Sequence, residues 1–286
     1  LGRMEESPEY FNKSLEIYNN LFEGDHLNKI TTLFNIGSYY TYRKMYEKAE
    51  DYMTKALDMC RRMSPVEDNS VCASCMIGLA GVYDSQEKFD LAEKYHKEAL
   101  AIRERLFKRD HPDIMQSLNN LGIHYIKKGE LRKADSFLEE CLAITGRIYP
   151  DDHPKLAIAC MNIGTLNHII NNAQKAEKYY GEGTKSFKNI IHNYFPGMSE
   201  KERTQFLLTV DDNFEGFNSF TVLRYKKSPS LLNKMYDNQL LLKGILISST
   251  QKVKRRILNS DDSSLTSLYY DWKTLKETIS QQYKIT

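Results

Sequence analysis

The chain has 286 residues and a mass of 33.3 kDa, which is room for two domains or for one elongated array of repeats. Its composition, 41% hydrophobic and 27% charged, is that of an ordinary globular protein, and a net charge of +2 excludes a dominant basic field that would attract nucleic acid. The scarcity of glycine and proline, 14 and 7 residues, argues against a loop-rich β-sandwich. No apolar run approaches the roughly 18 residues of a membrane helix, so no membrane partner is expected.

The ends of the chain and its cysteines indicate the setting of the protein. No signal peptide is predicted, because Glu5 and Glu6 stand where its apolar core would be. The odd number of cysteines, scattered over helix-like stretches, predicts reduced thiols and a cytoplasmic location; they are Cys60, Cys72, Cys75, Cys141 and Cys160. Residue 1 falls within a repeating unit rather than at its start, so we expect the chain to be a fragment of a longer protein.

A pattern of about 42 residues recurs four times, and a partial copy around Ser7 and Ser14 precedes it. Each copy has two apolar stretches separated by a short break, with apolar residues at three- and four-residue spacing. This spacing predicts a helical hairpin. A small residue lies inside each first stretch, at Gly37, Ala80, Gly122 and Gly164. The second stretches carry alanines 43, 42 and 42 residues apart, at Ala49, Ala92, Ala134 and Ala176. We expect these alanines to face the small residues, so that the two helices approach closely.

A linker containing Asp-His-Pro joins successive copies. It occupies residues 110–112 and 152–154, and a remnant lies at 24–27. Aspartate is a good N-cap and proline suits the first turn of a helix, so the triplet predicts a helix start rather than a metal or catalytic site. Its histidines recur once per repeat and are not expected to converge.

These residues resemble the tetratricopeptide repeat in the 42-residue form of kinesin light chains. The resemblance covers 1–192 as a half repeat plus four full repeats, although Asn167 and Gly183 depart from the pattern. It implies an all-α fold, a superhelix of helix-turn-helix hairpins whose first helices line a concave groove. Such grooves bind proteins or peptides.

The resemblance also assigns the residues that face this groove: Thr31, Phe34, Asn35, Ser38, Ile77, Asn119, Asn120, Ile123, Met161, Asn162 and Thr165. The absence of lysine and arginine from this set argues against a clamp for a peptide carboxylate. Asn35, Asn120 and Asn162 hold one equivalent position, and their amides both donate and accept hydrogen bonds. Two interpretations stay open: these amides bind a peptide backbone, or they join one repeat to the next.

A helical connector is expected over 193–286, where the period stops. Its predicted helices span 200–224, 229–247, 249–258 and 263–283, and Ser199 with Glu202 forms a capping box before the first. A basic cluster would spread over more than one helical face, which favours a solvated surface over a nucleic-acid site. Its residues are Lys252, Lys254, Arg255 and Arg256.

Within the connector, residues 236–247 and 270–275 are similar to the helical segment that precedes the CHAT domain, a caspase-like protease domain, in bacterial proteins with tetratricopeptide repeats. The resemblance implies a regulatory arm whose catalytic domain lies beyond Thr286. The alternatives are a plain interaction scaffold and a regulator that senses a signal peptide.

No enzyme activity, cofactor or metal site is predicted within the 286 residues. Cys72 and Cys75 lack a second cysteine pair at zinc spacing, and no phosphate-binding loop, HExxH or GxSxG motif occurs.

Overall fold

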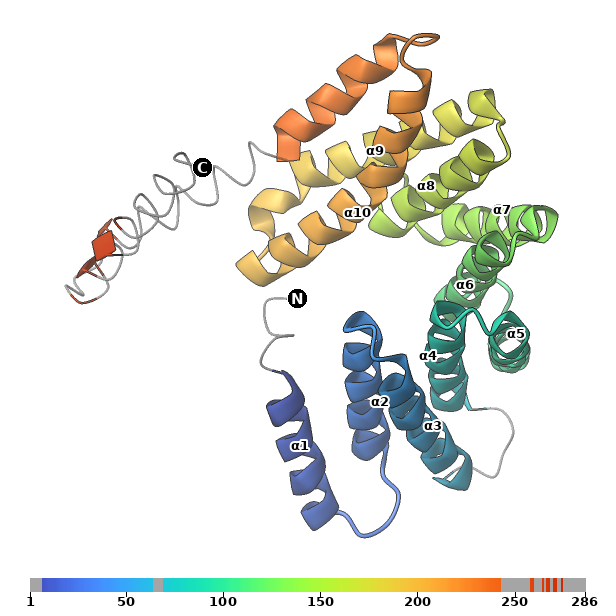
Figure 1. The fold of residues 1–286 in the computed structure, drawn as a ribbon, viewed down its shortest axis with the longest axis vertical. Coiled ribbons are helices and arrows are strands. Elements are labelled where there is room, and N and C mark those ends of the chain that lie inside the picture. Colours follow the sequence, from blue (N-terminus) through green and yellow to red (C-terminus); the bar gives the residue numbers. More distant parts are fainter. Residues whose placement is uncertain are drawn as a thin grey trace, which may run out of the picture. The chain divides into compact units, whose positions relative to one another are not determined.

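The computed structural model describes residues 7–63 and 69–242, together with 258–259, 264, 266–267, 270–271 and 274. Across these residues the regular structure is helical, without a strand (Figure 1). The chain divides into two compact units, Leu1–Phe220 and Thr221–Thr286, and the repeats lie in the first. No helix of the described residues is long and apolar enough to cross a membrane.

The helices follow the predicted repeats. A leading helix is followed by four helical hairpins, a 3₁₀ turn and a longer helix. Their bounds are α1 (Ser7–Leu21), α2 (Leu27–Tyr42), α3 (Tyr46–Met63), α4 (Ser70–Ser85), α5 (Phe89–Leu106), α6 (Pro112–Lys128), α7 (Leu131–Ile148), α8 (Pro154–Ile169), α9 (Ala173–Asn193), η1 (Phe195–Gly197) and α10 (Glu200–Arg224).

Within each hairpin the two helices pack against each other, and each second helix packs against the first helix of the next hairpin. The first helices α2, α4, α6 and α8 also contact one another in series, so they form one row (Figure 1). The predicted all-α repeat fold is therefore confirmed.

The small residues inside the first helices make room for large side chains rather than for alanines. A Cβ on Gly122 would lie 2.5 Å from the Leu138 side chain, and a Cβ on Gly37 would lie 2.8 Å from that of Met53. Leu138 stands one helical turn after Ala134, which was the residue expected at this contact. The expected close approach is present, but the residue that fills the space is different.

The linker between repeats starts a helix, as predicted, but its histidine is the cap. The ring Nδ1 accepts the backbone N–H two residues on at His26, His111 and His153. The preceding aspartate instead pairs with an arginine of the following second helix, in Arg62–Asp25 at 2.8 Å and Arg147–Asp110 at 2.7 Å. The expectation that aspartate caps these helices is therefore wrong.

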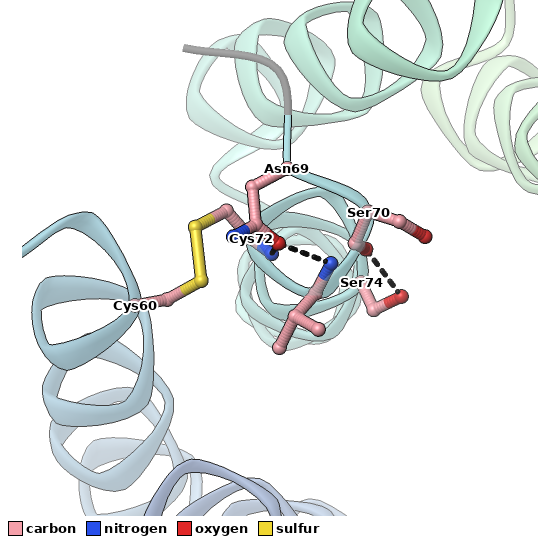
Figure 2. Close-up of a disulfide and its surroundings, with 6 residues drawn as sticks. Cys60, Asn69, Ser70, Cys72 and Ser74 are labelled. Carbon is pink, nitrogen blue, oxygen red and sulfur yellow. Dashed lines mark hydrogen bonds between the residues drawn. A yellow bond between two sulfur atoms is a disulfide. The ribbon is translucent and has the colours of Figure 1, made fainter. Parts of the chain in front are cut away.

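The cysteines overturn part of another expectation. Figure 2 shows a disulfide between Cys60, near the end of α3, and Cys72, in the first turn of α4. The stacking of successive hairpins brings these two turns together, with Cα atoms 5.6 Å apart. The prediction that all thiols are reduced is wrong for this pair, whereas Cys75, Cys141 and Cys160 are free and buried.

The first helix of the expected connector packs on the last repeat. The Ser199–Glu202 capping box forms, with the Ser199 N–H donating to the Glu202 carboxylate at 2.8 Å, and α10 has the predicted bounds. Phe206 and Phe214 of α10 contact the Phe187 ring of α9. The first unit accordingly extends to Phe220, and the sequence division at residue 192 stays a prediction.

Beyond α10, residues 230–242 are helical, within the predicted 229–247. The predicted helices 249–258 and 263–283 lie largely outside the described residues, as does the basic cluster of Lys252, Lys254, Arg255 and Arg256.

Candidate binding face

The row of first helices presents polar and apolar side chains that remain accessible. We define the candidate binding face by six of them, from α2, α4 and α6: Thr31, Asn35, Ser38, Ile77, Asn120 and Ile123. Thr31 and Asn35 are exposed, and the other four are half-buried. Its side chains are all uncharged.

The asparagine series is divided between two roles. The Nδ2 group of Asn162 donates to Oδ1 of Asn119 at 2.7 Å, which joins α8 to α6. The equivalent place between α2 and α4 is held by Phe34, whose ring lies 2.6 Å from where a Gly78 Cβ would be. Phe34, Asn119 and Asn162 therefore serve the packing of one repeat on the next.

Two predicted groove residues of α8 differ in their accessibility. Met161 is 1% exposed and packs against Gly183 of α9, so it is not available to a partner. The Thr165 hydroxyl accepts a hydrogen bond from Tyr180 at 3.1 Å, and Gly216 of α10 lies beside it. Met161 is therefore inaccessible on α8, whereas Thr165 is half-buried and remains a predicted groove residue.

The hydroxyl groups of the face are turned inward to their own helix. Thr31 donates to the Leu27 carbonyl at 3.1 Å, and Ser38 donates to the Phe34 carbonyl at 2.9 Å. Their donors are therefore engaged, as is common for such residues within helices. The side-chain amides of Asn35 and Asn120 remain the strongest hydrogen-bonding groups for a peptide backbone.

A buried arginine lies behind the face and was missed by the sequence reasoning. Arg103 of α5 is 2% exposed, and its guanidinium donates to the Asp113 carbonyl at 2.8 Å, to the Ser117 hydroxyl at 2.9 Å and to the Ser74 hydroxyl at 3.2 Å. Burial lowers the pKa of Arg103, against the opposing charge of Asp113. Its donors hold α4 and α6 together from within, and its own charge does not reach the surface.

The residues equivalent to Arg103 in the other repeats are uncharged: Cys60, Thr145 and Phe187. A charged residue at this position of the repeat is the sequence feature that could have predicted a buried polar contact there.

The free thiols offer no nucleophile. Burial raises the pKa of Cys75 to about 11 and that of Cys160 to about 12. Burial likewise raises the pKa of Cys141 to about 11. Because the thiolate is the reactive form, these three residues are inert near neutral pH.

The sequence profile described as "Tetratricopeptide repeat" matches residues 1–62, 71–147 and 113–189, which is more than half of the chain. The chain belongs to the tetratricopeptide repeat family. No match was found among curated proteins.

Several solved structures share the fold. BtubC (BKLC) from P. vanneervenii has a TM-score of 0.64 at 16% identity, over 84% of this chain and 92% of its own. A putative kinesin light chain from Podosopora anserina has a TM-score of 0.54 at 14% identity, over 68% of this chain and 90% of its own. A Rap protein complexed with competence and sporulation factor has a TM-score of 0.53 at 16% identity, over 89% of this chain and 74% of its own.

Proposed function

We propose that this protein is a binding module that takes an extended protein or peptide segment along the candidate binding face. The observation that carries the proposal is the continuous row of α2, α4 and α6, on which Asn35 and Asn120 keep accessible amides. Amides of this kind pair with a peptide backbone, while Ile77 and Ile123 offer apolar contact to side chains. An uncharged face selects an uncharged segment.

The comparisons support this proposal at the level of the fold. Arrays of helical hairpins use the surface of their first helices for recognition. The similar Rap protein is complexed with competence and sporulation factor, so this kind of helical array accommodates a binding partner.

Photo-crosslinking tests the location. A photoreactive phenylalanine analogue at Ile123 is expected to crosslink a peptide selected from a displayed random library. The same analogue at Ser136, an exposed residue of α7, is the matched control and should not crosslink. Equal crosslinking at both positions, or crosslinking at Ser136 alone, would contradict the proposal.

We also propose that the module regulates a CHAT-type caspase-like domain through the segment 193–286. Support comes from the similarity of residues 236–247 and 270–275 to the segment before such domains, although most of these residues beyond 242 lie outside the described ones. Sequencing the reading frame past codon 286 tests the link: a domain with a His–Cys pair is expected. Its absence would favour the scaffold or the signal-peptide regulator.

A further inference from the structure

Three buried side chains of the second and third repeats meet inside the array. Asp84 lies in the last turn of α4, His96 lies on α5 and His124 lies on α6; they are 6%, 4% and 0% exposed. The Asp84 carboxylate lies 3.0 Å from Nε2 of His96 and 2.6 Å from Nδ1 of His124. Their ligand atoms all lie within 4.8 Å of one another.

The repeat period shows that these residues are exceptions at their positions. The residues equivalent to His96 are large and mostly apolar: Met53, Leu138 and Tyr180. Those equivalent to His124 are Tyr39, Val82 and Leu166. The hairpin fold therefore needs no imidazole at either place. Two imidazoles and a carboxylate replace other residues at the point where three helices converge.

The local electrostatics favour a cation there. A buried carboxylate needs a paired charge or a metal ion. Among the described residues, the hydrogen bonds to Asp84 come from the two imidazoles and from no lysine or arginine.

We propose that Asp84, His96 and His124 bind one divalent transition-metal ion of the zinc class between the second and third repeats. Two imidazole nitrogens and one carboxylate oxygen suit such ions, whereas Ca²⁺ and Mg²⁺ prefer oxygen ligands throughout. The ion takes the lone pairs of Nε2 of His96 and Nδ1 of His124. Each ring proton then moves to the other nitrogen, which has no hydrogen-bond partner among the described residues.

The ion is expected to pin α4, α5 and α6 together, and α4 and α6 are two of the helices that carry the candidate binding face. It is structural in this account, because the three side chains are too buried to meet a substrate.

Metal titration of the protein after EDTA treatment and dialysis tests the site. One equivalent of Co²⁺ should give visible ligand-field bands without a thiolate charge-transfer band. Zn²⁺ at a hundredfold excess over its Kd should raise Tm by about 5 °C or more. His96→Leu and His124→Leu should abolish both effects, and they introduce the residue found at the equivalent positions Leu138 and Leu166.

The matched control is His111→Asn, which removes a histidine outside the cluster and leaves a capping residue, as Asn69 is for α4. It should keep one equivalent of Co²⁺. If the leucine variants fail to fold by circular dichroism, Asp84→Asn keeps the side-chain size and should lose the ion. Less than one equivalent bound by the wild type, or binding that survives in folded variants of the cluster, would overturn the proposal.

Discussion

Gly122 is the residue at which a repeat leaves least room for a side chain. A Cβ there would lie 2.5 Å from Leu138, a buried residue with little freedom to move. Gly122→Ala should therefore lower the free energy of unfolding by about 1–3 kcal/mol, because the overpacking outweighs the helix propensity gained. Urea denaturation measures it.

Gly81 supplies the control within α4, because nothing lies within 4 Å of a Cβ at that position. Gly81→Ala should raise the free energy of unfolding by roughly 0.5–1 kcal/mol. A shift of both variants in the same direction would contradict the packing explanation.

The ionisation of Glu93 makes the stability of the protein depend on pH. The hydrogen bond from Lys128, followed by that from Lys97, lowers the pKa of Glu93 from 4.5 to about 2, against the opposing effect of burial. Because its folded pKa lies below the unfolded one, the contribution is present above pH 4.5 and is lost as pH falls towards 2.

The Glu93→Gln variant should have a lower free energy of unfolding than the wild type at pH 7 and nearly the same free energy of unfolding at pH 2. Urea midpoints at both pH values check this, with Glu104→Gln on the exposed side of α5 as the control. A stability gap for Glu93→Gln that stays constant with pH would contradict it.

At the scale of the helix, the hydrogen bond between Asn162 and Asn119 shows that these two amides join one repeat to the next. The amide of Asn35 is left for a partner. Asn162→Ala removes the donor and leaves the half-buried Asn119 oxygen unpaired, so it should cost about 1 kcal/mol of stability. Asn35→Ala, at the equivalent but exposed position of α2, should cost almost nothing. Thermal melts compare the two, and equal effects would contradict the assignment.

The disulfide between α3 and α4 fixes how many of the five cysteines can react with a thiol reagent. Native protein should show no reaction with a thiol reagent such as DTNB, because Cys75, Cys141 and Cys160 are buried and protonated. Unfolding without reductant should expose these three thiols. Five thiols under the same conditions would show that Cys60 and Cys72 are unpaired in solution, as expected for a reducing compartment.

At the scale of the whole molecule, the repeat period predicted the architecture because each hairpin is a local unit that stacks on its neighbour. The period places every helix of the array, and the capping box places the start of α10. The repeat period could not show that α10 packs beside Thr165, because the aromatic residues of α10 do not belong to the repeat pattern.

The site was less predictable for a related reason. The repeat period makes Asn162 and Asn35 equivalent, but Asn162 alone of the two donates to an amide on the preceding first helix, that of Asn119. Departures from the repeat pattern would have indicated such contacts. Arg103 and His124 each stand where the other repeats have an uncharged residue, and each makes a buried polar contact.

The central claim is that an uncharged segment binds along α2, α4 and α6 through the amides of Asn35 and Asn120. Isothermal titration with a library-selected peptide should show roughly ten- to a hundredfold weaker binding for the Asn35→Ala, Asn120→Ala double variant, from two hydrogen bonds of about 0.5–1.5 kcal/mol each. Asn20→Ala, on the exposed side of α1, should bind like the wild type, and affinity should change little with added salt. Unchanged affinity of the double variant would contradict the account.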